Sequence, residues 1–150
     1  MKRVSPRYKP SLSTLMNLCE TNYMLMLKIL SDRELVGETR SFFISDFLSY
    51  TLTVNEVTKY TSVIAISQNA NVMGENLSEL FKPSMVIRLY HDARMAEVIS
   101  SQDIRQIKPR YDYPNSDMHQ PDEKQQINLF LKEWLQLCLQ LGQVNISLFS

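Results

Sequence analysis

The chain has 150 residues, with 16 basic and 16 acidic side chains, so its formal net charge is zero. Its three glycines, Gly37, Gly74 and Gly142, are too widely spaced for a glycine-rich phosphate loop. Two cysteines and two histidines give poor support for a structural zinc site. The neutral balance also argues against a general nucleic-acid-binding surface. We therefore expect one domain over residues 1–150 that needs no metal and no cofactor.

The N-terminal segment and the hydropathy pattern bear on cellular location. Residues 1–10 hold four basic side chains and two prolines, and we predict that they form a flexible basic arm. No small-residue cleavage site follows this arm. No run approaches the roughly 18 apolar residues that a membrane span needs. The sequence thus predicts a cytoplasmic protein without a membrane segment, whose two cysteines remain free thiols.

Two long amphipathic helices are predicted, one near each end of the chain. Apolar residues at steps of three and four from Leu12 to Leu30 indicate the first helix, with Ser11 as its cap and an end near residues 31–32. Pro121 suits the first turn of the second helix, and Gly142 suits the position after its last residue. The predicted apolar face of this second helix contains Ile127, Phe130, Leu131, Trp134, Cys138 and Leu141.

Between the helices the hydrophobic period changes to two, which is typical of strands with one buried face. Strands are predicted over residues 40–45, 47–57, 60–67, 85–91 and 94–99, with an edge strand over 144–149 and a short helix over 77–81. A two-residue turn at Asp92–Ala93 would place Tyr90 opposite Met95. It would also place Arg88 opposite Glu97, where the two side chains would form an ion pair across the strands.

These elements define the predicted fold class, which is α+β. The order is α-β-β-β-α-β-β-α with an added final strand. The strands occur as hairpins rather than as βαβ units, so the sheet should be antiparallel. We expect five or six strands, covered on one face by the two long helices. This order is similar to that of the small dimeric chaperones of type III secretion, an analogy of topology only.

A family resemblance rests on short strings of residues along most of the chain. The clearest is Arg110-Tyr-Asp-Tyr-Pro-Asn115; others begin at Arg88, at Gly37 and at Thr58, and several lie in the second helix. With these strings the chain resembles the YqiB-like proteins of proteobacteria, a domain of unknown function. The resemblance implies a cytoplasmic bacterial protein and supplies no catalytic residues.

The richest cluster of basic, aromatic and histidine side chains lies between residues 88 and 124. Arginine can bind an anion with two nitrogens and tyrosine offers a stacking face, so the segment could hold an anionic or planar ligand, or a partner. In the structural alternative, the tyrosines pack the segment onto the sheet and the arginine pairs with an acid. The candidate ligand- or partner-binding residues are Arg88, His91, Lys108, Arg110, Tyr111, Asp112, Tyr113, His119 and Lys124.

Catalytic chemistry receives little support from the sequence. His91 and His119 could act as acid and base, but a structural role is the favoured interpretation. Cys19 and Cys138 lie on apolar helix stripes and lack a neighbouring base, so we expect them to pack in the core. No residue is therefore assigned a catalytic role.

The first helix is rich in methionine, with Met16, Met24 and Met26. Such a stripe either belongs to the core or offers an adaptable partner surface. The width of the apolar arc, past Leu25 and Leu27, leaves room for a homodimer contact.

The favoured hypothesis is a non-catalytic protein-binding or adaptor module. One alternative is a small anionic-ligand-binding protein, or an enzyme, that uses residues 88–124. Another is a weak RNA binder that uses the basic arm and residues 82–110.

Overall fold

The structure is a computed structural model, and it describes residues 12–30, 35–70, 82–102, 104 and 120–147. Two long helices occur in this part of the chain, α1 (Leu12–Leu30) and α3 (Gln120–Leu141). The strands are β1 (Thr39–Phe43), β2 (Leu48–Val57), β3 (Thr61–Ala70), β4 (Ser84–Tyr90), β5 (Met95–Gln102) and β6 (Gln143–Ser147). The predicted basic arm and the predicted short helix over 77–81 lie outside the described residues.

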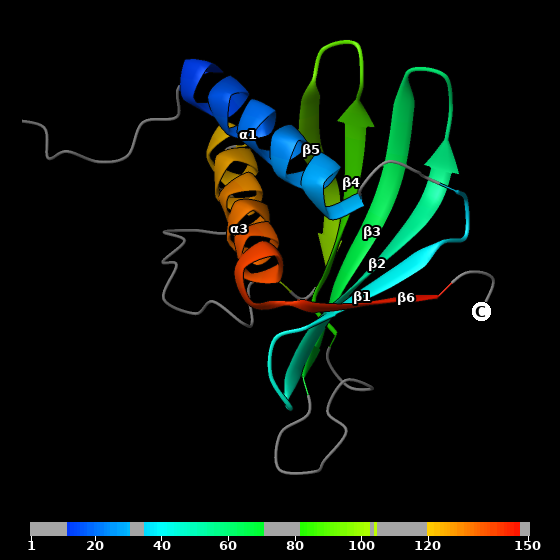
Figure 1. The fold of residues 1–150 in the computed structure, drawn as a ribbon. Coiled ribbons are helices and arrows are strands. Elements are labelled where there is room, and N and C mark those ends of the chain that lie inside the picture. Colours follow the sequence, from blue (N-terminus) through cyan, green and yellow to red (C-terminus); the bar gives the residue numbers. More distant parts are fainter. Residues whose placement is uncertain (1–11, 31–34, 71–81, 103, 105–119, 148–150) are drawn as a thin grey trace, which may run out of the picture.

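The six strands form one antiparallel sheet in the order β5-β4-β3-β2-β1-β6. From β1 to β5 each strand lies beside the one that precedes it in the chain. After β5 the chain passes through α3 and adds β6 at the opposite edge, next to β1. Both helices pack on the same face of the sheet (Figure 1). The predicted α+β class, the antiparallel sheet and the two-helix layer are confirmed.

The β4–β5 hairpin has the predicted register, with Arg88 opposite Glu97 and Tyr90 opposite Met95. The turn covers the four residues from His91 to Arg94 rather than two. Arg94 adopts a left-handed backbone conformation with a φ of 57°, which side-chain-bearing residues adopt uncommonly. The predicted turn length was therefore wrong, although the pairing of the strands was right.

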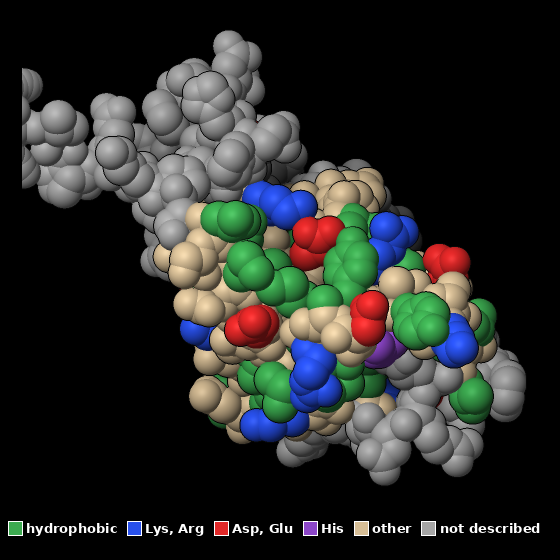
Figure 2. All heavy atoms as spheres, turned by 90° about the horizontal axis from the view of Figure 1, so that it is seen from above, with side chains coloured by type: hydrophobic (Ala, Val, Ile, Leu, Met, Phe, Trp, Pro, Cys, Tyr) green, Lys and Arg blue, Asp and Glu red, His purple; other side chains and the backbone are tan. Residues whose placement is uncertain are grey.

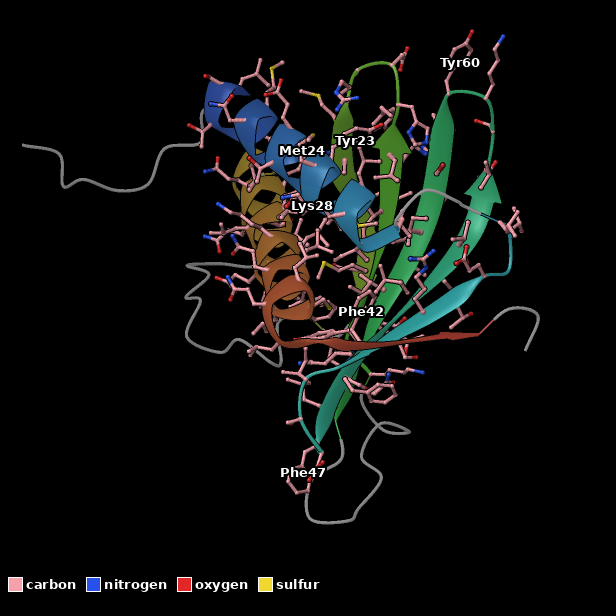
Figure 3. All side chains as sticks on the ribbon, in the orientation of Figure 1. Tyr23, Met24, Lys28, Phe42, Phe47 and Tyr60 are labelled. Carbon is pink, nitrogen blue, oxygen red and sulfur yellow. The ribbon has the colours of Figure 1, made fainter. Side chains whose placement is uncertain are left out.

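The core lies between the sheet and the two helices. Trp134 of α3 packs against Tyr50 of β2 with 4.9 Å between ring centroids, and Phe42 of β1 lies in the same space near α3 (Figure 3). Alternation along β2 is as predicted, since Tyr50, Leu52 and Val54 are buried. The largest fully buried side chains are Tyr50, Met26, Ile29, Leu30, Leu52, Ile64, Ile66, Met85, Ile87, Leu89, Leu131 and Leu135.

The C-terminal end of α3 departs from the predicted apolar face. Leu141 is 57% exposed, because it is the last residue of the helix, where the chain turns away toward β6. Gly142 follows directly, and its N–H donates to the Cys138 carbonyl at 3.0 Å. A Cβ at this position would lie 2.6 Å from that carbonyl oxygen and 3.0 Å from the Phe42 Cβ. Glycine is therefore required here by close packing.

A buried ion pair ties the end of α1 to β1. The Arg40 Nη2 lies 2.8 Å from the Glu38 Oε2, and the Arg40 Nε donates to the same oxygen at 2.9 Å. The Arg40 Nη1 donates to the carbonyl of Ile29 at 3.0 Å. That carbonyl belongs to the last turn of α1, where backbone carbonyls have no N–H donor within the helix. Arg40 thus stabilises a helix end as well as a buried carboxylate.

Two asparagines join the helices to the edge strand β5. The Asn22 side chain of α1 donates to the backbone carbonyl of Asn128 in α3 at 2.9 Å. The Asn128 Oδ1 accepts the N–H of Val98 at 3.0 Å, and its Nδ2 donates to the Lys124 carbonyl at 2.8 Å. Val98 borders an irregularity in the β4–β5 pairing. Asn128 therefore satisfies a backbone donor of an edge strand.

Candidate functional site

His91 lies at the junction of α1, β3 and the β4–β5 turn. Its Nδ1 lies 3.0 Å from the Tyr23 hydroxyl, and its Nε2 lies 2.8 Å from the Ser62 Oγ. Its backbone N–H donates to the Tyr60 carbonyl at 2.8 Å. The Tyr23 and His91 rings also meet edge to face. Figure 3 shows Tyr23 between α1 and the upper ends of β4 and β5.

The Ser62–His91–Tyr23 arrangement has the connectivity of a nucleophile, a base and an orienting group. Ser62 is fully buried, at 0% exposure, so a substrate cannot reach its hydroxyl. A phenol also replaces the carboxylate that would stabilise an imidazolium. The Nδ1 of His91 therefore ties the β4–β5 turn to α1, and its Nε2 ties that turn to β3, which is the structural interpretation of this residue.

Arg88 and Lys124 both act on the carboxylate of Glu97. The Lys124 Nζ lies 2.9 Å from the Glu97 Oε1, and the Tyr90 hydroxyl donates to the Oε2 at 2.8 Å. Glu97 thus forms its ion pair with Lys124 rather than with Arg88, the predicted partner. Lys124 lies on α3, which packs beside β5. Arg88 still influences Glu97 through its charge.

The pKa of Glu97 reflects this environment. Burial favours the protonated carboxyl, but the hydrogen bonds from Lys124 and Tyr90 and the charges of Lys124 and Arg88 outweigh burial, so the pKa of Glu97 is lowered. Burial and the bond to Glu97 raise the pKa of Tyr90. The cluster is a set of mutually satisfied charges.

The candidate residues predicted from the sequence are therefore only partly located. Among the described ones, Lys124 pairs with Glu97, and Arg88 acts on the same carboxylate through its charge. His91 is bonded instead to Ser62 and Tyr23, on the side of the sheet that the helices cover. The remaining candidates, Lys108, Arg110, Tyr111, Asp112, Tyr113 and His119, lie outside the described residues.

Both cysteines are buried, as predicted. Burial raises the pKa of Cys19 to about 11, with a further contribution from the charge of Glu97, and burial raises that of Cys138 to about 12. Thiols with such pKa values are almost entirely protonated at neutral pH, and the thiol is a poor nucleophile. Within the described residues, no group of His, Cys, Asp and Glu side chains is arranged to hold a metal ion.

The outer surface of α1 is the second feature of interest. Leu12, Met16, Glu20, Met24 and Lys28 recur every four residues and are all exposed, so they form one oblique ridge that winds slowly around the helix. We call these five residues the outer ridge. Leu12 is 73% exposed, Met16 43% and Met24 46%. From above, hydrophobic side chains share this side of the molecule with charged ones, and the described histidine is visible among them (Figure 2).

Met24 is positioned by a neighbour from the β4–β5 turn. The Arg94 Nη2 lies 3.4 Å from the Met24 Sδ, and the guanidinium carbon lies 5.2 Å from the centre of the Tyr23 ring. The cation–π contact holds Arg94 beside the ridge. Met24 is therefore an exposed thioether with a defined position.

Several of these contacts join residues far apart in the sequence and were not predicted. Asn22 and Asn128 did leave a signal, because each stands within an apolar helical stripe, at positions where a polar side chain needs a buried partner. Tyr23 and His91 are separated by 68 residues, so no local pattern could have paired them.

The fold and these contacts define an α+β protein whose helices cover one face of an antiparallel sheet. The chain belongs to the family described as "Protein of unknown function (DUF1249)", whose model matches residues 25–144. It is 44% identical over 143 residues to the "Uncharacterized protein YqiB" of Escherichia coli strain K12. The aligned region covers 95% of this chain and 99% of that relative. The YqiB of E. coli O157:H7 matches to the same extent.

The predicted resemblance to YqiB-like proteins is thereby confirmed. No solved structure matches the chain. In the part of the chain that is described, no helix is long and apolar enough to cross a membrane.

Proposed function

We propose that this chain is a non-catalytic, cytoplasmic protein-binding module that contacts its partner through the outer ridge of α1. The observation that carries the proposal is the exposure of Leu12, Met16 and Met24 along one oblique ridge of the helix. Methionine is flexible and polarizable, so it adapts to the shape of a partner. A run of exposed apolar side chains bordered by charged ones is typical of a surface that binds protein.

The state of the reactive side chains supports a role without catalysis. The Ser62 hydroxyl is buried and both ring nitrogens of His91 have partners. The raised pKa values of Cys19 and Cys138 disfavour their thiolates. Among the described residues, these are the groups that acid–base or nucleophilic chemistry would most readily use.

Binding of a small anion by the segment between residues 88 and 124 is the alternative. Two basic side chains of this segment that the structure describes, Arg88 and Lys124, already act on the Glu97 carboxylate. Their charge is therefore less available to attract a second anion. Binding of RNA would depend on the basic arm and on residues 82–110. Among the residues that the structure describes, no contact supports either alternative, so we prefer protein binding.

The test measures the size of the complex that contains the chain in extract of its native cells. The wild-type chain should elute above the 17.5 kDa of one chain. Replacing both ridge methionines, in a Met16→Gln and Met24→Gln variant, should shift elution toward that mass, because glutamine keeps helix propensity but removes the apolar contact.

A matched control replaces exposed apolar residues of α3, as Leu139→Gln and Leu141→Gln, which are 39% and 57% exposed. This control should elute with the wild type. Elution of the wild type as a single chain, or an equal shift in the control, would contradict protein binding through α1.

A further inference from the structure

We infer that the partner of the outer ridge is a second copy of this chain, bound through two antiparallel α1 helices whose two-fold axis passes beside Met24. This inference rests on the proposed function and names its partner. The order of side chains along the ridge, with one acidic and one basic residue on either side of a methionine, is self-complementary. From the N-terminal end the ridge contains Leu12, Met16, Glu20, Met24 and Lys28.

Glu20 and Lys28 stand four residues before and four residues after Met24. They lie about 12 Å apart along one helix, at about 1.5 Å per residue, which is too far for them to pair with each other. Neither forms an ion pair within the part of the chain that the structure describes. Both are exposed, so each is available to an outside partner.

A two-fold axis at Met24 places Glu20 of each copy beside Lys28 of the other. The interface is then self-complementary, as two-fold symmetry requires: Met24 meets Met24, and two Glu–Lys pairs flank it. Figure 3 shows Met24 and Lys28 on the same helix, with Met24 nearer the N-terminal end. Residues at intervals of four form the ridges along which helices most often pack.

The other registers along the ridge are less favourable. An axis at Glu20 would bring two carboxylates together and leave Lys28 opposite Leu12. An axis at Met16 would place Glu20 opposite Leu12. Among axes centred on a residue of the outer ridge, the axis at Met24 is the one that places Glu20 opposite Lys28, so the order of these two charges favours this register. Arg94, whose guanidinium lies over the Tyr23 ring, places its Nη2 3.4 Å from the Met24 Sδ, beside the proposed axis.

Sedimentation equilibrium of the purified chain tests the assembly. At about 100 µM, well above micromolar dissociation constants, the wild type should have twice the 17.5 kDa mass of one chain. Glu20→Lys alone, or Lys28→Glu alone, creates two like-charge contacts and should raise the dissociation constant about tenfold. The double swap, Glu20→Lys with Lys28→Glu, restores the pairs and should return the constant to within about threefold of wild type.

The control for general charge effects is Glu56→Lys, at an exposed position of β2. It should leave the dissociation constant unchanged. A monomeric wild type overturns the inference, and so does a double swap that binds more weakly than either single variant.

A cysteine cross-link tests the register. Met24→Cys should form a disulfide between two copies under mild oxidation, while the native cysteines remain buried. Ser13→Cys on the same helix should not, because eleven residues at about 1.5 Å each place it about 16 Å from the axis and about 33 Å from its mate. Equal cross-linking at both positions, or none at Met24→Cys, overturns the register.

The failures of the two proposals are distinguishable. A purified chain that is monomeric, while the complex in extract still depends on Met16 and Met24, overturns the homodimer and keeps the protein-binding proposal. A chain that is monomeric in both settings overturns both.

Discussion

Replacing Arg40 by methionine is expected to destabilise the fold strongly, although the residue looks like an ordinary surface arginine in the sequence. Arg40 and Glu38 are only 8% and 6% exposed. The substitution keeps most of the side-chain stem and removes the guanidinium. It leaves the Glu38 carboxylate buried, where the Leu35 N–H at 3.4 Å is its remaining hydrogen-bond donor among the described residues, and it removes the donor from the Ile29 carbonyl.

The expected cost follows from these contacts. Breaking a buried ion pair by removing one partner costs about 3–5 kcal/mol, since the remaining charge is uncompensated. We predict a loss of about 3 kcal/mol in the free energy of unfolding for Arg40→Met. The double variant Glu38→Gln with Arg40→Met removes the buried charge as well, and it should recover at least about 1 kcal/mol of that loss.

Urea denaturation followed by fluorescence is a suitable assay, because Trp134 is the chain's one tryptophan and is buried beside Tyr50. With a slope of about 1–3 kcal/mol per molar urea, the midpoint should fall by at least about 1 M. Glu56→Gln, at an exposed position, serves as the control and should change stability by less than about 0.5 kcal/mol. A loss below about 1 kcal/mol for Arg40→Met would refute the argument that this pair is buried and structural.

Three further predictions concern other contacts. Tyr23→Phe keeps the ring but removes its bond to His91, so the free energy of unfolding should fall by about 1 kcal/mol in the same denaturation assay; no change would mean that this bond does not hold α1. With pKa values of about 11 and 12, the two cysteines should react with a thiol reagent at pH 8 only after urea unfolds the chain; rapid native labelling would contradict their burial. Because the pKa of Glu97 is lowered in the folded state, its ionised carboxylate stabilises the fold above the ordinary pKa of 4.5, and this stabilisation is lost as the pH falls through the folded-state pKa. Lys124→Met should therefore weaken the dependence of thermal unfolding on acid pH. Identical pH profiles for the variant and the wild type would contradict the ion pair.

The sequence predicted the layers of this fold because burial imposes a period on each element. The alternation in β2 and the three-and-four spacing in α1 follow directly from one buried face. The β4–β5 register was also predictable, since both strands alternate and a short connection joins them. Leu141 was assigned wrongly because periodicity cannot tell where the sheet stops covering a helix.

The polar contacts between elements were beyond such reasoning. Arg40 meets both Glu38 and the end of α1, and Asn128 meets an edge strand; each contact depends on how the helices lie on the sheet. Of the candidate site, the sequence singled out the methionine-rich first helix and left open whether its stripe was core or partner surface. It did not show that Met26 is buried while Met16 and Met24 are exposed. The sequence pattern does not mark where the buried part of an apolar helix stripe ends and the exposed part begins.

Photo-cross-linking in living cells shows whether the outer ridge of α1 contacts another protein. A photoreactive amino acid is placed at Met24 in one strain and at Asn55, an exposed residue of β2, in another. We expect a discrete protein adduct from position 24, with the mass of two chains, and little or none from position 55. Absence of an adduct at position 24, or equal adducts at both positions, would contradict the claim.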